Sequence, residues 1–346
     1  MQKRMLFKAV TPLRAGATFA ASAAIVIGSV GLATSDAAAS STKATLAHYK
    51  APPANACKGK TLGEADISTT ISFLAVMDNA MAKEARRLGM RTTVLGANLD
   101  NGTEVSNIED LIAKKVDVID VTSQSPTAVG GAVRQAWAAH IPVIAVNAPL
   151  APSVKVVTYE GDANYQYGQG IGRLILKALP KGGKIALLVG PLGDSVATAR
   201  TAGIKSVIRS HKDIKIVATE VDNFDNPTAL ADTQDLLSKY PKGTLQAIVA
   251  EGPEIFVGAD YARAHGYRYL KFIGGDYPKQ VAAAIRSGAM YGTVDQSPVL
   301  EGKLGADFAC DYLLGKKSLI PSPTALVPLP IITKANVRKV PAVWDD

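Results

Sequence analysis

The chain alternates between two hydrophobic patterns over most of its length. Short runs rich in β-branched and other apolar residues, such as 116–121 and 142–146, are typical of buried strands. Between them lie longer segments with apolar residues at helical spacing, of which 73–88 is an example. Strands that alternate with helices predict parallel sheets with crossover helices, and therefore an α/β fold.

This alternation occurs twice along the chain. The first half is predicted to hold strands at 60–67, 91–95, 116–121, 142–146 and 154–159, with helices at 73–88, 105–114 and 126–139. The second half is predicted to hold strands at 184–189, 214–221, 246–249, 271–274 and 291–294, with helices at 167–179, 197–210, 227–239, 254–265 and 279–287. A helix at 299–314 and a strand near 326–332, interrupted by proline, follow. Two doubly wound halves predict two lobes with a cleft at the carboxyl ends of their strands.

The N-terminus indicates export. A positively charged start precedes an uncharged apolar stretch at 15–32, and Ala37-Ala38-Ala39 then gives a small-residue cleavage pattern. We interpret residues 1–39 as a cleaved secretory signal peptide and expect the mature protein in the periplasm. The alternative is a membrane anchor, which the single Ala-rich segment and the cleavage pattern disfavour. Residues 40–57 contain two adjacent prolines and predict an extended leader.

Charge and cysteine content narrow the function further. The whole sequence carries a formal charge of +8, and the signal peptide accounts for four positive charges and one negative, so +5 remains. This charge is spread along the chain and does not indicate a nucleic-acid partner. No second long apolar run follows, so we expect a soluble mature protein. The two cysteines, Cys57 and Cys310, have no metal ligands at suitable spacing, although export permits a disulfide.

The motifs that could support catalysis are weak. Gly168, Gly170 and Gly172 do not have the spacing of a dinucleotide-binding loop and are better read as small residues that let a helix pack closely. No nucleophile elbow, phosphate-binding loop or zinc-protease pattern is present in the sequence. We therefore predict that the protein is not an enzyme and uses no metal or redox cofactor.

Several segments, in order, resemble one family: the type I periplasmic binding proteins of ABC importers, especially the sugar-binding branch related to ribose-binding protein. The segments that carry this resemblance are 73 and 85–89, 107–112, 141–144, 222–225 with 234–237, 273–276, and 293–296. The resemblance covers nearly the whole chain after the leader. It implies two lobes that are joined by three crossovers and close on a ligand by a hinge.

The resemblance also implies domain limits. Lobe one would hold residues 58–161 and 296–321, and lobe two would hold residues 162–295 and 322–346. Cys57 and Cys310 would then share lobe one, which makes a disulfide possible without deciding whether it forms.

Ligand contacts in this family lie at strand ends and loop tips. Phe73 and Phe224 match its two stacking aromatics, and Asp276 and Gln296 match polar positions outright. Alternatively, the two phenylalanines belong to the core and Asp276 caps the helix at 279–287. The resemblance gives these candidate ligand-binding residues: Thr69, Thr70, Phe73, Asn147, Thr198, Phe224, Glu251, Asp276, Tyr277 and Gln296.

Two departures from the family pattern leave the ligand open. Asn147-Ala148 stands where sugar binders carry Asp-Arg, which removes both charges. Ile71-Ser72 replaces an amide-containing pair, so Thr69 and its neighbour would have to supply hydroxyl groups instead. The resemblance still favours a sugar, polyol or related cyclic molecule. It implies a monomer that delivers this ligand to an ABC permease, or alternatively a sensory module for a chemoreceptor or histidine kinase.

Overall fold

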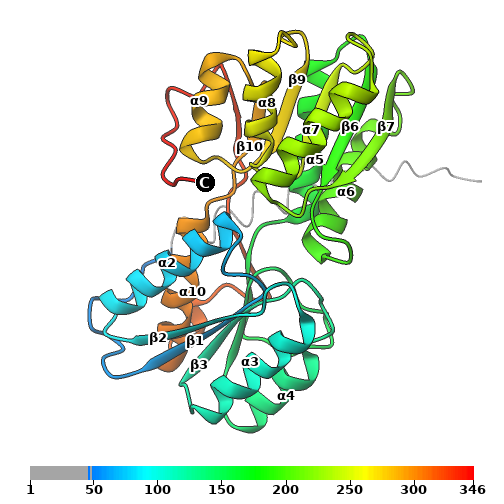
Figure 1. Ribbon diagram of the computed structural model, residues 1–346. Helices are drawn as coiled ribbons and strands as arrows, with labels where there is room; N and C mark the ends of the chain where they lie inside the picture. The colour runs from blue at the N-terminus through cyan, green and yellow to red at the C-terminus, as the bar shows by residue number, and fades with distance from the viewer. Residues whose placement is uncertain (1–45, 47–48) are drawn as a thin grey trace, which may run out of the picture.

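The computed structural model describes residue 46 and residues 49–346. The predicted signal peptide and the first part of the predicted leader lie outside these residues. None of the described helices is long and apolar enough to span a membrane. The chain forms two α/β lobes, each built on a six-stranded sheet (Figure 1), which confirms the predicted fold class.

Lobe one has strand order β11-β5-β4-β3-β1-β2, and all of its paired strands run parallel. Helices α2 and α10 cover one face of this sheet, and α3 and α4 cover the other. Its elements are β1 (Thr61–Asp66), α2 (Ser72–Arg87), β2 (Arg91–Gly96), α3 (Asn101–Ala113), β3 (Val118–Thr122), α4 (Gly130–Ala138), β4 (Val143–Asn147), β5 (Tyr159–Gly161), α10 (Pro298–Leu313), the 3₁₀ turn η1 (Lys317–Leu319) and β11 (Thr324–Leu326).

Lobe two has strand order β12-β10-β9-β8-β6-β7, with β12 antiparallel to β10 and the other pairs parallel. Helices α5 and α6 cover one face, and α7, α8 and α9 cover the other. Its elements are α5 (Asn164–Ala178), β6 (Gly183–Val189), α6 (Ser195–Ile208), β7 (Ile214–Val221), α7 (Asn226–Lys239), β8 (Ala247–Ala250), α8 (Ile255–Ala264), β9 (Lys271–Gly275), α9 (Lys279–Ser287), β10 (Gly292–Val294) and β12 (Ile331–Thr333).

The chain crosses between the lobes three times: from β5 to α5, from β10 to α10, and from β11 to β12. The strand predicted near 326–332, interrupted by proline, is two short strands in the structure. Pro328 and Pro330 have no N–H to donate to a sheet, and they separate two short strands that join different sheets. Because β11 pairs with β5, residues 324–326 belong with lobe one and not with lobe two as predicted.

Helix starts also differ from the predictions. α3 begins four residues earlier than predicted because Asp100 caps it, with its carboxylate accepting from the Thr103 N–H at 2.6 Å. In contrast, α4 begins at Gly130, four residues after the expected start at Pro126. The intervening residues form a turn.

The predicted close packing of the glycine-rich helix is confirmed. A methyl group on Gly168 of α5 would overlap the backbone of Arg200 in α6, and one on Gly203 of α6 would overlap the backbone of Tyr165 in α5. These glycines therefore let the two helix backbones approach closely.

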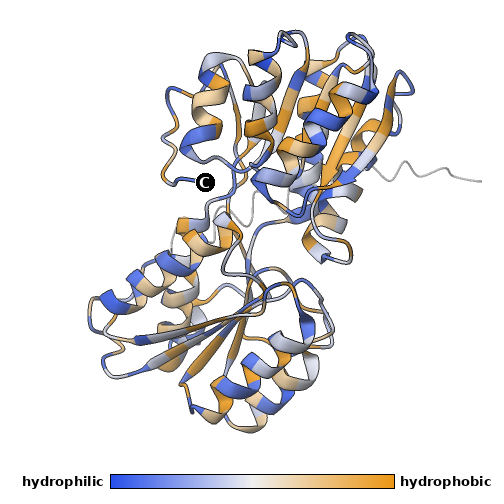
Figure 2. Ribbon diagram, in the orientation of Figure 1, coloured by the Kyte–Doolittle hydropathy of each residue, from blue (hydrophilic) through white to orange (hydrophobic). Residues whose placement is uncertain are grey.

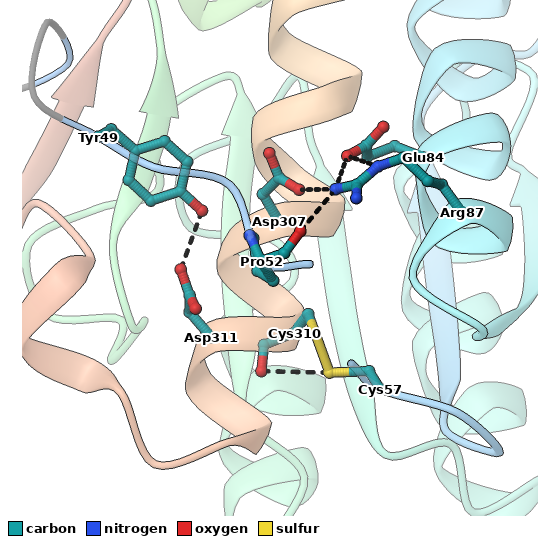
Figure 3. Close-up of a disulfide and its surroundings, with 8 residues drawn as sticks. All are labelled: Tyr49, Pro52, Cys57, Glu84, Arg87, Asp307, Cys310 and Asp311. Carbon is teal, nitrogen blue, oxygen red and sulfur yellow. Dashed lines mark hydrogen bonds and ion pairs between the residues drawn. A yellow bond between two sulfur atoms is a disulfide. The ribbon is translucent and has the colours of Figure 1, made fainter. Parts of the chain in front are cut away.

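A disulfide fastens the start of the described chain to lobe one. Cys57 lies before β1 and Cys310 lies in α10, and their Cα atoms are 5.8 Å apart. The sequence left this pairing open, and the structure shows it. Nearby, the Tyr49 hydroxyl donates to Asp311 of α10 at 2.9 Å (Figure 3). Residues 49–57 are thus held against the lobe at both ends of the segment.

Candidate ligand-binding cleft

A cavity lies between the carboxyl ends of the two sheets, and both lobes contribute to its wall. Its empty volume is about 670 Å³, a figure that includes space open to solvent. Lobe one and the crossing before α10 contribute Ile67, Ile71, Ser72, Phe73, Leu74, Leu99, Thr122, Ser123, Gln124, Asn147, Ala148 and Gln296. Lobe two and the end of the chain contribute Pro191, Asp194, Val196, Arg200, Phe224, Pro253, Asp276 and Asp346.

Four residues of the wall have left-handed backbone conformations. The φ angles are 64° at Leu99, 61° at Asn147, 57° at Phe224 and 54° at Asp276. Such angles cost a non-glycine residue about 1–3 kcal/mol and cluster at functional sites. Asn147 ends β4, Asp276 follows β9, Leu99 lies between β2 and α3, and Phe224 lies between β7 and α7, so all four lie near the carboxyl ends of strands. The strained backbone favours this edge of both sheets as the candidate binding site.

A buried arginine organises the polar side of the cavity. The guanidinium of Arg200 donates to the backbone oxygen of Glu251 at 3.1 Å and to the side-chain oxygen of Gln296 at 2.5 Å. It lies 3.5 Å from the carboxylate of Asp162, and its central carbon is 3.8 Å from the ring centroid of Tyr167. Since a buried charge is stable only when it is paired, these contacts fix the position of the guanidinium.

The hydrogen bonds continue from Arg200 into lobe one. Gln296 lies in the crossing between β10 and α10, and its side-chain nitrogen donates to Glu301 at 2.7 Å. The other carboxylate oxygen of Glu301 accepts from the side chain of Asn147 at 3.0 Å. A buried chain of polar groups therefore connects the two lobes along the wall of the cavity.

Asp276 is held from lobe two. The Tyr167 hydroxyl donates to its carboxylate at 2.8 Å. Burial raises the pKa of Asp276 to about 7, although Arg200 and the hydrogen bond from Tyr167 act to lower it. The alternative reading of Asp276 as a helix cap is wrong, because Pro278 is the N-cap of α9 and no side chain caps that helix. The carboxyl group thus remains free to contact a ligand.

Of the ten candidate residues, the structure brings five together in the cavity wall: Phe73, Asn147, Phe224, Asp276 and Gln296. Thr69 and Thr70 do not line it and are exposed to solvent. Thr198 does not line it either, because its hydroxyl donates to the backbone oxygen of Asp194 at 2.7 Å within α6.

Glu251 and Tyr277 lie beside cavity residues but face the interior of lobe two. The carboxylate of Glu251 accepts from the Thr201 hydroxyl and from the Gly190 N–H. The Tyr277 hydroxyl donates to the backbone oxygen of Val340 at 3.0 Å. Both side chains support the loops that carry the site and do not form its surface.

The family resemblance assigned the ligand-binding position of this helix to Thr198, two residues before Arg200. Residues two apart on a helix point in nearly opposite directions, whereas residues four apart share a face. Val196 and Arg200 therefore face the cavity, and Thr198, on which the comparison placed the ligand-binding position, faces away. Arg200 could have been recognised as a candidate from its charge, because it is the one arginine in a helix that has few charged residues.

Among the described residues, Glu64, Asp66 and Asp78 form a group with the spacing of metal ligands, with one oxygen from each lying within 4.8 Å of the others. The group lies in the core of lobe one. Thr122 donates to Glu64 at 3.1 Å and the Ser68 N–H donates to Asp66 at 3.0 Å. Burial raises the pKa of all three carboxyl groups, that of Asp78 to about 7. Carboxyl groups that retain protons can bond to one another without a cation, so we assign no metal here.

Two α/β lobes, three crossings and a cavity lined by both lobes define a class of protein that encloses a small molecule between its lobes. Residues 67–317 match the family described as periplasmic binding protein domain. The chain belongs to this family, as the sequence resemblance predicted.

Curated relatives and solved structures agree with this assignment. The ribose import binding protein of Haemophilus influenzae is 32% identical over 245 residues, which cover 71% of this chain and 82% of the relative. The xylitol-binding protein of Mycolicibacterium smegmatis is 28% identical over 77% of this chain and 75% of the relative. The structure of a Bacillus halodurans ABC transporter solute-binding protein with bound myo-inositol has a TM-score of 0.74 at 24% identity, covering 82% of this chain and 97% of that protein.

Proposed function

We propose that this protein captures an uncharged sugar or polyol between its lobes and delivers it to an ABC permease for import. The relatives named above bind ribose and xylitol, and another relative, from Paraburkholderia graminis, is a D-apiose import binding protein. All three names concern small compounds with several hydroxyl groups. Sugars and polyols are therefore the best starting point in the search for the ligand.

One observation carries the proposal: the cavity combines two aromatic rings with a fixed set of polar groups. Phe73 comes from lobe one and Phe224 from lobe two, so a ring-shaped ligand can contact both through its apolar faces. Asn147, Asp276 and Arg200 provide hydrogen-bond donors and acceptors near the same space. Apolar walls with a few positioned polar groups are typical of small-molecule sites.

The charges of the site favour an uncharged ligand. Arg200 already contacts the carboxylate of Asp162 and the amide of Gln296, so its charge is compensated within the protein. Ala148 lines the cavity where sugar binders of this family carry arginine, so this position offers no charge to an anionic ligand. A ligand carboxylate would also meet the side chain of Asp276.

We further propose that the protein is exported to the periplasm, acts as a monomer and has no enzymatic activity. The signal peptide predicted from the sequence and the periplasmic binding protein family support export. The import function printed for the ribose relatives favours delivery to a permease over a sensory role. N-terminal sequencing of protein recovered from a periplasmic fraction, followed by size-exclusion chromatography, would test these points.

The ligand can be sought directly. A protein that begins at residue 40 should gain thermal stability from at least one of ribose, xylitol, D-apiose, D-allose and myo-inositol, because binding to the folded state alone raises the melting temperature. Mass spectrometry of the protein as purified would identify a co-purifying ligand without a prior choice. If no compound of this class stabilises the protein or co-purifies with it, the proposed ligand class is wrong.

The Asp276→Ala substitution tests the site. We expect it to remove the stabilisation by the sugar or polyol that binds the wild type while leaving a folded protein, because Asp276 presents a carboxyl group to the cavity. Thr70→Ala is the matched control, since Thr70 is exposed and does not line the cavity. Unchanged binding by the Asp276 variant would show that the ligand contacts other groups.

A further inference from the structure

The last residues of the chain return to the cavity between the lobes. From β12 onward the chain runs along lobe two, where Val337 packs in its core. It then ends on the side of lobe two that is turned toward lobe one (Figure 1). Residues 344–346, here called the tail, lie beyond the segment that matches the family. Two of these residues have features that packing on lobe two alone does not explain.

The backbone of the tail is anchored on lobe two. The N–H of Lys279, the first residue of α9, donates to the backbone oxygen of Trp344 at 2.9 Å. This carbonyl satisfies one of the free N–H groups of a helix that has no side-chain cap. The side chain of Gln280 accepts from the Asp346 N–H at 3.1 Å and donates to the Asp346 oxygen at 3.0 Å. The tail therefore stays with lobe two.

The side chain of Trp344, in contrast, packs in lobe one. It is 3% exposed and belongs to the hydrophobic cluster formed by α2, α10 and their sheet. Its ring meets the ring of Phe73 edge to face, with centroids 5.9 Å apart. The indole nitrogen has no hydrogen-bond partner among the described residues, so packing alone holds the ring. A residue attached to lobe two thus fills a position against the aromatic wall of lobe one.

Asp346 places a carboxyl group at the cavity itself. It is the one residue of the tail in the cavity wall. Its carboxylate accepts from the side chain of Asn226, at the start of α7, at 3.0 Å. Ser72, at the start of α2 in lobe one, also lines the cavity, and it acts to lower the pKa of this carboxyl group, which burial raises. Asp346 therefore lies between groups of both lobes, next to the space proposed for the ligand.

We infer that the tail is a latch of the binding site: Trp344 and Asp346 hold the lobes together over the ligand, and Trp344 positions the ligand-stacking ring of Phe73. The inference rests on the proposed function, since it concerns the same cavity. Contacts that join the lobes form only when the lobes are close, so they favour the closed arrangement that retains a ligand. Loss of the latch lowers the closed fraction and weakens apparent binding by the same factor.

Tryptophan fluorescence tests the latch without a ligand. The chain has two tryptophans, so the Trp137→Phe variant leaves Trp344 as the single reporter. We expect blue-shifted emission and protection from acrylamide, because the ring is buried. Adding the Phe73→Ala substitution should shift the emission to the red, since Phe73 is the ring that Trp344 contacts. Emission typical of an exposed indole before Phe73 is changed would contradict the inference.

Ligand binding supplies the second test. The probe is whichever of ribose, xylitol, D-apiose, D-allose and myo-inositol most stabilises the wild type. We expect Trp344→Ala, and a chain ending at Val343, to bind this probe about tenfold more weakly, mainly through faster dissociation. Trp344→Phe should bind nearly as the wild type, because its ring can fill the same position. Asp345→Asn is the matched control, since Asp345 is exposed and its one ion pair with a described residue is with Lys279 of the same lobe.

The outcomes separate the latch from the proposed function. If the wild type binds none of the five compounds, the proposed ligand class fails, and the fluorescence test alone decides whether the tail bridges the lobes. If the wild type binds but Trp344→Ala has the same affinity and dissociation rate, the latch is refuted and the proposed function stands. Circular dichroism confirms that the weakened variants remain folded.

Discussion

The two lobes have the same strand order, yet their cores differ at equivalent positions. In lobe one Glu64 pairs in register with Asp120, and both lie on the sheet face under α2 and α10. In lobe two the corresponding register pair is Leu187 with Val249, under α5 and α6. Figure 2 shows the strands of lobe two as largely hydrophobic, whereas those of lobe one alternate more. Lobe one thus buries carboxyl groups where lobe two buries aliphatic side chains.

This difference carries a cost that lobe one offsets in two ways. Burial raises the pKa of Asp120 to about 8, so the group keeps its proton near neutral pH and avoids a buried charge. The disulfide between Cys57 and Cys310 restrains the unfolded chain of the same lobe. Among the described residues, lobe two has no disulfide, and the face of its sheet under α5 and α6 is covered by apolar side chains at the positions where lobe one has Glu64 and Asp120. The folds are alike, but the sources of their stability are not.

The largest effect should come from moving a carboxyl group into lobe two. We expect Val249→Asp to lower the free energy of unfolding by about 4 kcal/mol or more, because the new carboxyl group would be fully buried in the hydrophobic cluster under α5 and α6. Val249→Ala, which only deletes two methyl groups, should cost about 2 kcal/mol. Urea unfolding of the two variants measures the difference. Equal losses would mean that lobe two tolerates a buried carboxyl group as lobe one does.

The next effect concerns the disulfide. The Cys57→Ser, Cys310→Ser double variant should lose about 2–4 kcal/mol, since the bond closes a loop that spans 253 residues. Reduction of the wild type should lower its stability by the same amount, and a reducing agent should leave the double variant unchanged. If the oxidised wild type and the double variant unfolded at the same urea concentration, the disulfide would not contribute to the stability of lobe one.

The pH dependence of stability should reflect the carboxyl groups of lobe one. Because the pKa of Asp120 is raised, the folded state holds a proton that the unfolded state releases near pH 4. Stability should therefore fall as the pH rises from about 5 to about 8. Asp120→Asn has no proton to lose, so it should flatten this slope by about 1–2 kcal/mol over the same range.

Asp117 in the same lobe provides a control of opposite sign. Burial alone would raise its pKa, but Lys60 and Thr61 lower it through hydrogen bonds. Asp117→Asn should consequently reduce stability at pH 7, and this loss should shrink as the pH falls below about 4.

The urea midpoint of the wild type tests the prediction for Asp120. If this midpoint stays constant from pH 5 to pH 8, the buried carboxyl groups of lobe one do not set the pH dependence of stability.

Most of the fold could be predicted because its signal is repeated and local. Consecutive apolar residues in β4 and helical spacing in α2 each indicate their own structure. Buried acids such as Asp120 could not be recognised, since an acidic residue in a strand reads as a solvent-facing position. Only the register that places Asp120 opposite Glu64, under two helices, reveals its burial.

Site residues could be predicted where they lie next to the carboxyl ends of strands. Asn147 and Asp276 stand at or just after the carboxyl ends of strands, and such positions line the cavity of an α/β fold. In helix α6 the ligand-binding position was assigned to Thr198 and not to Arg200, and two residues decide which face of a helix a side chain takes. Nothing in the sequence indicated that Asp346 returns to the cavity, since a chain end has no periodic pattern that fixes its direction.

The smallest effects should appear where the lobes are alike. Asp100 caps α3 in lobe one by accepting from the Thr103 N–H at 2.6 Å, and Asp225 caps α7 in lobe two by accepting from the Thr228 N–H at 2.9 Å. We expect Asp100→Ala and Asp225→Ala each to cost about 1 kcal/mol, measured by urea unfolding. These caps lie at exposed helix starts and do not depend on either core. Matching losses would locate the difference between the lobes in their buried faces, whereas unequal losses would show that the cores also change the strength of local interactions at the surface.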